Sequence, residues 1–351
     1  MSFKSIPVVA GKVTGTLSDF PVLIQPSAIS GFGSITLAEA QSIRIYTDEA
    51  KTTELAREVV AADEIWVKVT SLSTSSVLYV DYDGIRSDYA VTATYGRNNV
   101  WSDYAAVWHM EEDPSTTNIV DATGNGIALS SQGSMTSGDS VAGPFGSKAI
   151  EFDGVNDALA VTGATSLEPD TSDFTMQCWG KPITAGVGRE PVIWKGVDSG
   201  SGFGTDWYHM EYDFGGDGKI GWGIDDGSAF DGLRGADIST SYGLNSWNLW
   251  HAVRDHGSNM KMFQDGVQIG SVAKTQGDVS PNGTFYIARN YTGDYSNVVV
   301  DEVRIRRSIL SADWISAEEE NMRDNGAFWG TASDIGGAAA QQSNFLAFMG
   351  A

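Results

Sequence analysis

An alternation of apolar and polar side chains with a period of two is the feature that most constrains the fold of this chain. Phe174, Met176 and Cys178 alternate with Thr175 and Gln177. Successive side chains of a β-strand point to opposite faces of a sheet, so this spacing predicts a half-buried strand and not a helix. The same reasoning predicts strands at residues 21–24, 42–47, 64–69, 77–82, 173–181, 247–253, 259–264, 267–270, 284–290 and 298–306.

Glycine-rich turns separate these segments. The chain has 351 residues, with 41 glycines and only 9 prolines, and aromatic residues make up 11% of it. Asp265 and Gly266 predict a tight type I′ turn between two of the strands. Strands that follow one another through short turns, without helices between them, are typical of antiparallel sheets. The sequence therefore predicts an all-β protein that is long enough for two domains with separate cores.

One short helix is expected near the C-terminus. Ser311 is a suitable N-cap, Asp313 lies in the first turn and Gly326 is a suitable stop signal. Beyond the helix, residues 327–351 are rich in Gly, Ala, Ser and Gln, with apolar side chains near the end. This end is either a frayed tail or a segment that becomes ordered on a partner subunit.

The composition excludes some partners and one kind of cross-link. The formal net charge is −23, so the surface repels nucleic acid, and it repels acidic polysaccharides unless divalent cations intervene. Cys178 is the single cysteine, so the chain cannot form an internal disulfide. We interpret Cys178 as a small buried apolar residue and not as a catalytic thiol.

The first residues carry no recognisable export signal. Residues 1–12 contain no apolar run of the 7 to 15 residues that a secretory signal needs. No segment of the sequence approaches the ~20 apolar residues of a transmembrane helix. We therefore expect a protein that is not inserted in a membrane and that leaves its cell, if it does, by another route than general secretion.

Several motifs occur in the order and at the spacing of a jelly-roll family. Residues 106–112 read Ala-Val-Trp-His-Met-Glu-Glu, residues 121–126 read Asp-Ala-Thr-Gly-Asn-Gly, and residues 147–159 contain Ile-Glu-Phe-Asp-Gly-Val-Asn-Asp. Val-Asp-Glu-Val-Arg-Ile follows at residues 300–305, and Leu-Ser-Ala-Asp-Trp-Ile at residues 310–315. This succession resembles the laminin-G-like branch of the concanavalin A-like jelly rolls. The resemblance implies a scaffold that usually binds glycans or proteins.

The first hundred residues carry a second set of motifs. Residues 17–24 read Leu-Ser-Asp-Phe-Pro-Val-Leu-Ile, residues 44–49 read Arg-Ile-Tyr-Thr-Asp-Glu, and residues 66–73 read Trp-Val-Lys-Val-Thr-Ser-Leu-Ser. They resemble a small β-sandwich domain of unknown function that often precedes laminin-G-like domains in bacterial surface proteins. The two resemblances together predict a β-sandwich domain at 1–100, a jelly roll at 101–310 and a C-terminal helix with an assembly tail at 311–351.

The jelly-roll class includes β-glucanases, whose Glu-x-Asp-x-Glu signature is only partly present. On one strand these three carboxylates share a face, and the outer two span the ~5 Å that a retaining mechanism needs. The nearest match is Glu211, Asp213 and Gly215, in which the third carboxylate is missing. No His-Glu-x-x-His motif and no Gly-x-Ser-x-Gly elbow is present either. The sequence therefore predicts a protein that is not an enzyme.

One loop has the composition of a calcium site. Ca²⁺ takes six to eight oxygen ligands from carboxylates, amides and backbone carbonyls. In laminin-G-like and glucanase jelly rolls, an early aspartate loop and an aspartate on the last strand often share one calcium. The resemblance thus implies a structural Ca²⁺ held by Asp121, Asn125 and Asp301. The alternative is an ordinary turn built on the Asp121 side chain together with a solvated strand charge.

Aromatic residues on the concave face are the candidates for ligand binding. Sugar-binding proteins use exposed aromatic rings that are flanked by carboxylates and amides. The alternative is that these rings fill the core of the sandwich, which explains most aromatic residues in such a fold. The candidate ligand-binding residues are Trp207, Tyr208, Trp222, Trp250 and Asp225.

These observations favour a non-catalytic protein that displays a binding domain. Because no export signal is recognised, we expect a phage virion protein of the decoration, fibre or receptor-binding type, released from the host by lysis. Its expected partners are a surface glycan or host receptor and other subunits of the assembly, including copies of itself. The alternatives are a divergent β-glucanase-type glycoside hydrolase, whose acid/base comes from another strand, and a bacterial surface adhesin.

Overall fold

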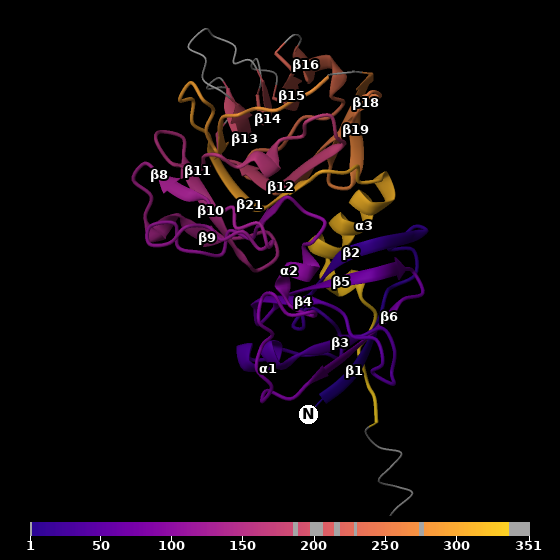
Figure 1. Cartoon of the computed structure of the whole chain (residues 1–351). Helices are drawn as coiled ribbons and strands as arrows, with labels where there is room; N and C mark the ends of the chain where they lie inside the picture. The colour runs from indigo at the N-terminus through magenta and orange to yellow at the C-terminus, as the bar shows by residue number, and fades with distance from the viewer. Residues whose placement is uncertain are drawn as a thin grey trace, which may run out of the picture. The chain divides into compact units, whose positions relative to one another are not determined.

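The computed structural model describes residues 2–184, 189–196, 206–213, 218–227, 230–273 and 277–336. The chain divides into two compact units. The first unit combines residues 1–100 with the segment from residue 320 onward, and the second unit is residues 101–319. The second unit is therefore inserted between two parts of the first (Figure 1).

Two small antiparallel sheets form the first unit. Its sheet orders are β22-β1-β6-β3 and β2-β5-β4. The apolar side chains at alternate positions of β5, Ile65, Val67 and Val69, are buried, but Trp66 on the opposite face is buried as well, so this part of the strand is not half-buried as predicted. The strands are β1 (Ser2–Pro7), β2 (Thr16–Ile24), β3 (Arg44–Tyr46), β4 (Arg57–Ala61), β5 (Glu64–Ser73), β6 (Val77–Tyr82) and β22 (Ser333–Asp334).

Two short helices accompany these sheets, α1 (Leu37–Ser42) and α2 (Arg97–Val100). The start of α1 is a capping box in which the Thr36 side chain accepts from the Glu39 backbone N–H. The Glu39 carboxylate in turn accepts from the Thr36 backbone N–H at 2.8 Å. This Thr-x-x-Glu spacing is a helix signal, yet the sequence analysis did not assign α1.

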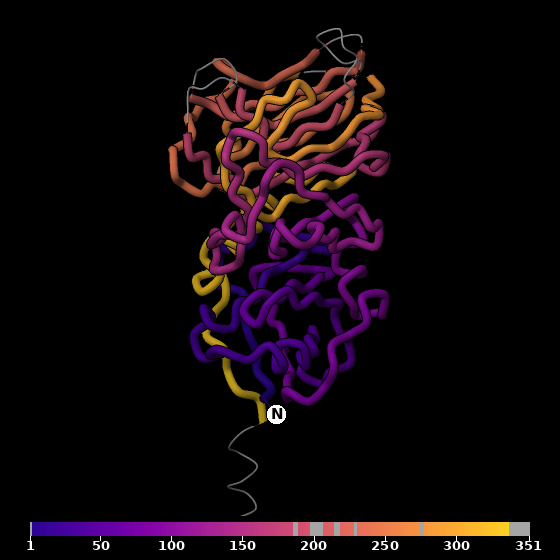
Figure 2. Tube along the Cα trace, turned by 90° about the vertical axis from the view of Figure 1, so that its left-hand side faces the viewer, coloured from indigo at the N-terminus to yellow at the C-terminus, as the bar shows by residue number. Residues whose placement is uncertain are grey.

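The C-terminal segment completes the first unit. β22 pairs antiparallel with β1, with Lys4 opposite Asp334. Asn325 and Trp329 donate side-chain hydrogen bonds of 2.7 Å and 3.0 Å to the Leu23 carbonyl of β2. The C-terminal trace runs beside β1 in both views of the chain (Figures 1 and 2).

The prediction of a separate C-terminal region at 311–351 is therefore wrong for its described part. Residues 311–319 belong to the second unit, whereas residues 320–336 pack into the first unit. The reason is that Asn325 and Trp329 bond the backbone of β2, and the Trp329 ring is buried. The predicted assembly tail extends over residues 337–351, which lie outside the described residues.

The second unit is built from two larger antiparallel sheets. The eight-stranded sheet has the order β19-β18-β17-β12-β21-β10-β9, and β7 also pairs with β21. Its strands are β7 (Ala106–Trp108), β9 (Ser140–Ala142), β10 (Lys148–Asp153), β12 (Phe174–Pro182), β17 (Asn248–Asp255), β18 (Asn259–Gln264), β19 (Val267–Ala273) and β21 (Asn297–Arg306).

The seven-stranded sheet has the order β16-β15-β14-β13-β20-β11-β8. The hydrophobic core contains side chains of both sheets, among them Phe174 and Met176 of β12 and Phe285 of β20. The predicted all-β fold is confirmed. The strands of this sheet are β8 (Ser130–Gln132), β11 (Ala158–Val161), β13 (Glu190–Gly196), β14 (Trp207–Tyr212), β15 (Ile220–Asp225), β16 (Phe230–Leu233) and β20 (Thr284–Ile287).

The expected C-terminal helix is α3 (Ala312–Arg323). The Ser311 hydroxyl accepts a hydrogen bond from the Trp314 backbone N–H at 3.1 Å, as an N-cap does. The helix ends three residues before the predicted stop at Gly326, because Asp324 caps a further short helix, α4 (Asn325–Phe328). Single 3₁₀ turns occupy Ser137–Asp139, Thr165–Leu167 and Gly235–Asp237.

A buried group of charged residues joins α3 to the eight-stranded sheet. The Glu318 carboxylate accepts from Arg304 Nη1 at 2.9 Å and lies 2.9 Å from His251 Nε2. Arg304 also donates to Glu302 from Nε at 2.9 Å. Burial alone would raise the pKa of Glu318, but the hydrogen bond from His251 and the charge of Arg304 outweigh it and lower that pKa. We call Glu302, Arg304, Glu318 and His251 the buried charge network.

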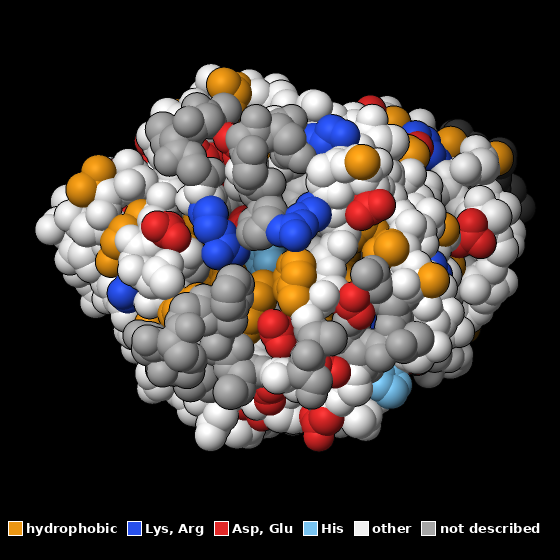
Figure 3. Space-filling view, turned by 90° about the horizontal axis from the view of Figure 1, so that it is seen from above, with side chains coloured by type: hydrophobic (Ala, Val, Ile, Leu, Met, Phe, Trp, Pro, Cys, Tyr) orange, Lys and Arg blue, Asp and Glu red, His pale blue; other side chains and the backbone are white. Residues whose placement is uncertain are grey.

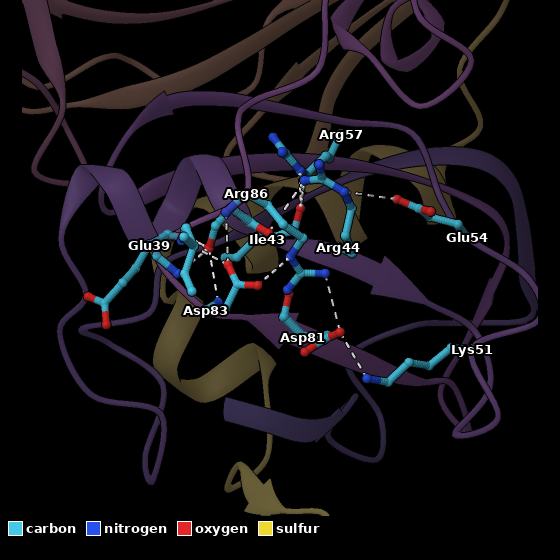
Figure 4. Close-up of polar contacts among 12 residues, drawn as sticks. Glu39, Ile43, Arg44, Lys51, Glu54, Arg57, Asp81, Asp83 and Arg86 are labelled. Carbon is cyan, nitrogen blue, oxygen red and sulfur yellow. Dashed lines mark hydrogen bonds and ion pairs between the residues drawn. The ribbon is translucent and has the colours of Figure 1, made fainter. Parts of the chain in front are cut away.

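The first unit contains a polar cluster near α1 (Figure 4). Arg86 pairs with Asp83 at 3.0 Å and with Asp81 at 3.3 Å. The buried Arg57 donates to the Ile43 carbonyl at 2.6 Å and to the Asp88 carboxylate at 2.7 Å. Because these arginine donors bind acceptors of the same unit, we interpret the cluster as structural.

Among the described residues, no helix is both long enough and apolar enough to cross a membrane.

Candidate binding site

The face of the seven-stranded sheet that points away from the core is the strongest candidate site. Along β14, Tyr208, Met210 and Tyr212 point into the core, so Trp207 and His209 point to the opposite face. We call this opposite face the outer face. Figure 3 looks down on it and shows hydrophobic side chains beside Lys and Arg side chains, with Asp and Glu side chains around them.

Four aromatic side chains gather on the outer face. We call Trp194, Trp207, His209 and Phe230 the tryptophan cluster. The Trp194 and Trp207 rings are stacked, with centroids 4.9 Å apart and planes 15° apart. The ring centroid of Trp207 lies 4.8 Å from that of His209 and 5.1 Å from that of Phe230. The cluster thus joins strands β13, β14 and β16.

A glycine makes room for this cluster. Gly223 of β15 lies opposite His209 in the strand register. A Cβ atom at Gly223 would lie 2.6 Å from the Phe230 ring and 2.8 Å from the His209 ring. Both distances are shorter than carbon atoms tolerate, so any larger residue at 223 would displace the two rings. The glycine lets the rings lie close against the sheet.

An ion pair borders the tryptophan cluster. Arg189 donates to the Glu211 carboxylate through Nε at 3.2 Å and through Nη2 at 3.1 Å. His209 Nε2 lies 3.4 Å from the same carboxylate. Burial alone would raise the pKa of Glu211, but His209 and Arg189 outweigh it and hold that pKa below its usual value. Glu211 is therefore an ionised, occupied carboxylate and cannot serve as a proton donor at neutral pH.

A second group lies on the same face, toward β8. The guanidinium of Arg289 lies 4.9 Å from the ring centroid of Tyr286 and 5.3 Å from that of Tyr295. Arg289 Nη1 donates to the Gln132 side chain at 2.9 Å. Tyr291, two residues after Arg289, contacts the tryptophan cluster, because its ring centroid is 5.4 Å from that of Trp194. We call Arg289, Tyr286, Tyr291 and Tyr295 the tyrosine–arginine cluster.

Residues 153–316 match the sequence model of the Concanavalin A-like lectin/glucanases superfamily. The second unit, which contains these residues, is therefore similar to that superfamily, and we call it the laminin-G-like domain after this similarity. A search of the curated proteins found no match.

Parts of the chain are also similar to solved structures at low sequence identity. The binding domain of Paraclostridial Mosquitocidal Protein 1 is 16% identical, with 62% of this chain and 52% of that chain covered and a TM-score of 0.48. Domain 4 of AbnA, a GH43 extracellular arabinanase from Geobacillus stearothermophilus, in complex with arabinotriose, is 17% identical. The match covers 61% of this chain and 97% of that chain, with a TM-score of 0.47. The present chain thus spans about half the length of the first of these proteins.

The laminin-G-like domain divides the predicted ligand-binding residues between its two faces. Trp207 lies on the outer face within the tryptophan cluster, but it is only 5% exposed, so its ring is not openly exposed as predicted. Tyr208, Trp222 and Trp250 point into the core, so the prediction that these three rings are exposed for a ligand is wrong. The reason is the strand period, which places Trp207 and Tyr208 on opposite faces. Trp222 and Trp250 also use their indole N–H groups internally, toward the Lys261 carbonyl and the Tyr212 hydroxyl.

Asp225 is the second predicted ligand-binding residue on the outer face. It lies opposite Trp207 and Phe230 in the strand register. One carboxylate oxygen accepts a hydrogen bond from the Gly227 backbone N–H at 2.8 Å. Burial raises the pKa of Asp225, and the nearby charges of Asp226 and Asp206 raise it further. Its position beside the tryptophan cluster keeps Asp225 a candidate polar contact for a ligand.

The sequence analysis missed Trp194, Arg189 and the tyrosine–arginine cluster. Trp194 is 1% exposed, and its indole N–H has no hydrogen-bond partner among the described residues. An unsatisfied buried donor costs about 1–3 kcal/mol, so this N–H is a site where an acceptor would stabilise the domain. The alternation of residues 190–196 carried a signal for Trp194, but a bulge between Pro191 and Ile193 interrupts it.

The predicted calcium ligands do not fit a shared metal ion. The Asp121 carboxylate accepts from the backbone N–H groups of Val107, Thr123 and Ile127 at 2.9–3.2 Å, and from the Thr123 hydroxyl at 2.7 Å. A carboxylate offers about four acceptor positions, so these four donors occupy Asp121 fully. Asp301 accepts from the Ser147 hydroxyl and from the Glu302 backbone N–H.

Asn125 is also engaged within its own unit. Its side-chain amide donates to the Ala105 carbonyl at 2.9 Å and to the Tyr104 carbonyl at 3.3 Å. The loop at residues 121–126 is therefore held by a turn on the Asp121 side chain, as in the first part of the alternative that the sequence left open. The second part of that alternative is wrong, because Asp301 is buried and is not a solvated strand charge.

The carboxylates near the end of β14 do not line up as a glucanase set does. Asp213 follows the last residue of β14 and has a positive φ of 56°, so the strand alternation stops before it. Gly215 lies outside the described residues. Burial and the neighbouring charge of Asp213 raise the pKa of Glu190 to about 7. Glu190, however, lies opposite the core-facing Tyr212 in the register, whereas Glu211 is on the outer face.

Proposed function

We propose that the laminin-G-like domain is a non-catalytic binding module and that its outer face holds a glycan. The tryptophan cluster carries this proposal, because aromatic side chains on the face opposite the core are not needed to fill it. Stacking on aromatic rings and a few fixed polar groups are how concave protein sites bind sugars. Arg189, Asp225 and the indole N–H of Trp194 supply such polar groups here.

Among the described residues, Glu211 and Glu190 do not form a usable acid–base pair on the outer face, and this supports binding over catalysis. A glycosidase needs one carboxyl group that donates a proton and a second that is ionised, on the two sides of one glycosidic bond. Glu211 is bound by Arg189, and Glu190 lies on the other face of the sheet. These two carboxyl groups cannot flank the same bond without a rearrangement of β13.

Glycan-array binding of the full chain, compared with the variant Trp207→Ala, tests the binding function. We expect the variant to lose about two- to tenfold in affinity, since an aromatic stacking contact contributes about 0.5–1.5 kcal/mol beyond burial. The matched control is Trp247→Ala, because Trp247 precedes β17 of the other sheet. If no glycan binds, or if both variants bind like the parent chain, the proposed binding site is wrong.

Glycoside hydrolysis is the second candidate function, and the raised pKa of Glu190 is the observation that favours it. Its test is incubation with mixed β-glucans and measurement of new reducing ends. We expect none to form. Hydrolysis that Glu190→Gln and Glu211→Gln both abolish would replace the binding proposal with an enzymatic one.

We infer further that the chain displays this domain as part of a phage virion, with copies of itself as partners. The support is a division of roles, since the polar clusters of the first unit are engaged internally while the second unit carries the candidate site. A bacterial surface adhesin is the alternative. Immunogold labelling of purified phage particles and of the host cell surface separates the two, and labelling of cells alone would contradict the virion role.

A further inference from the structure

Arg289 is held in place by rings and an amide, without a counter-charge. Its guanidinium lies between Tyr286 and Tyr295, and Gln132 accepts from Nη1 at 2.9 Å. The backbone of Arg289 forms a bridge with Tyr295, which fixes the loop that carries the second ring. A guanidinium that is clasped by two aromatic faces loses little further freedom when it binds a ligand.

No carboxylate pairs with Arg289 within the described part of the chain. Arg57, Arg86, Arg189 and Arg304 each have a carboxylate within 3.3 Å or less. Asp294, the acidic residue of the loop after Arg289, accepts instead from the Asn290 amide at 2.6 Å and the Thr292 hydroxyl at 3.0 Å. The lack of a partner is informative because the chain has 45 acidic and only 22 basic residues.

The hydrogen-bonding edge of Arg289 also lacks an acceptor. Its Nε is buried and has no hydrogen-bond partner among the described residues. Since Nη1 of Arg289 donates its hydrogen bond to Gln132, the edge of the guanidinium formed by Nε and Nη2 is the one that a ligand would bind. Two parallel N–H groups on one edge match the two oxygens of a carboxylate better than they match a single hydroxyl.

The tyrosine–arginine cluster continues the tryptophan cluster. Tyr286 lies opposite Trp194 in the register of β20 and β13. Tyr291 contacts the Trp194 ring, with a centroid distance of 5.4 Å. One oligosaccharide can therefore lie across both clusters, with one of its sugars at Arg289.

We propose that Arg289 is a subsite for a sugar carboxylate, so that the ligand of the outer face is a carboxylated glycan. This inference rests on the proposed function of the outer face. The net charge of −23 repels such a glycan at long range, so the attraction must be local. The positive charge of Arg289 without a carboxylate partner supplies it.

The test is an array of uronic-acid and sialic-acid glycans, each printed beside its carboxyl-reduced counterpart. We expect the parent chain to prefer the carboxylated member of each bound pair by about 10- to 100-fold, the range for a hydrogen bond to a charged group. Arg289→Gln should abolish this preference. Arg289→Lys keeps the charge without the planar fork and should retain only part of the preference.

Lys181→Gln is the matched control, since it removes one positive charge from the other sheet, where Lys181 lies over the Trp247 ring. It should bind like the parent chain, and thermal unfolding should show that all variants fold. Equal binding of the carboxylated and reduced glycans, or preference for sulfated glycans over carboxylated ones, would overturn the proposal and leave glycan binding standing. If no glycan of any kind binds, the proposed function fails together with this subsite.

Discussion

Charged side chains lie on both sheets of the laminin-G-like domain, but the two groups differ in how their charges are paired. On the eight-stranded sheet, Glu318 satisfies Arg304 and His251 at once, and Arg304 also binds Glu302. On the seven-stranded sheet, Arg189 and Glu211 form a pair, while Arg289 on the same face has no carboxylate among the described residues. Each ionisable side chain of the first group has an ionisable partner of opposite charge, and we call such a group closed, although Nδ1 of His251 has no hydrogen-bond partner among the described residues. We call the second group open, because Arg289 has no carboxylate partner among the described residues.

The difference teaches where function is to be sought in a jelly roll. A buried charge is tolerated only when its hydrogen bonds are made within the protein, so a complete network indicates a structural role. A partly exposed arginine that is held by rings, beside a buried indole N–H without an acceptor, retains donors for a ligand. Arg306 of the eight-stranded sheet shares part of this arrangement, since its guanidinium lies over the Tyr104 and Trp314 rings and its Nε and Nη1 are buried without a hydrogen-bond partner among the described residues.

The largest expected effect comes from breaking the buried charge network. Glu318→Ala leaves Arg304 and His251 without their common acceptor inside the protein. We expect a loss of about 3–5 kcal/mol in the free energy of unfolding, as for other broken buried ion pairs. Denaturant unfolding measures it. The control Asp313→Asn, at an exposed position of α3, should change stability by no more than about 0.5 kcal/mol. Similar effects of both variants would mean that the network is not closed.

Acid should weaken the same network. Burial alone would raise the pKa values of Glu302 and Glu318 in the folded state. His109 and Arg304 outweigh this effect and lower the pKa of Glu302. His251 and Arg304 do the same for Glu318. The unfolded chain therefore binds more protons at low pH, so this stability is present above the usual carboxyl pKa and is lost as the pH falls through the lowered values. Thermal unfolding from pH 7 to pH 3 measures the loss. A Glu318→Gln variant that keeps the full acid dependence would contradict the assignment.

Glu190 should make the stability of the protein depend on pH in the opposite direction. Burial and Asp213 raise its pKa to about 7, so the folded state holds the proton more tightly than the unfolded chain. Stability from this group is present below the usual carboxyl pKa and declines as the pH rises from about 4.5 to about 7. Glu190→Gln should flatten the thermal stability profile in this window. An unchanged profile would show that the carboxyl group is not perturbed.

A smaller effect is expected from the ion pair of the outer face. Glu211→Gln removes the charge that Arg189 binds, but the Arg189 side chain is 34% exposed and can be solvated. We therefore expect a loss of about 1–2 kcal/mol, less than for the closed network. Equilibrium unfolding in urea compares the two variants. A loss as large as that of Glu318→Ala would show that the outer face is as closed as the other sheet.

The smallest effect is expected from removal of divalent cations. Hydrogen-bond donors of its own unit fill the acceptor positions of Asp121, so the carboxylate has no position left for a calcium ion. A chelator should leave the melting temperature unchanged within about 1 °C, whereas loss of a bound structural ion lowers it. Added Ca²⁺ is the reciprocal control. A clear change of the melting temperature in either experiment would show that a cation binds at a site that the hydrogen bonds do not indicate.

Most of the fold could be predicted from the sequence. The period of two and the glycine-rich turns gave the antiparallel sheets, and Ser311 gave the start of α3. What could not be predicted is the return of the chain to the first unit. It depends on contacts between Asn325, Trp329 and Leu23, about 300 residues apart in sequence, and no local pattern encodes them.

The site was predictable only in part. Trp207 and Asp225 lie on the outer face, whereas Trp222 and Trp250 fill the core. Deciding between the faces requires the register of each strand, which a bulge in β13 shifts. The role of Arg289 was invisible because Tyr286, Tyr295 and Gln132 converge on it from different strands and a loop.

The interrupted first unit has a consequence for biosynthesis. Residues 320–336 leave the ribosome only after the whole laminin-G-like domain has been made. Until then, β1 lacks its neighbour β22, and the backbone of β2 lacks the hydrogen bonds of Asn325 and Trp329. The inserted domain can mature first, while the earlier strands wait with an unpaired edge. Ribosomes that stall within the insert therefore release nascent chains prone to aggregation through that edge.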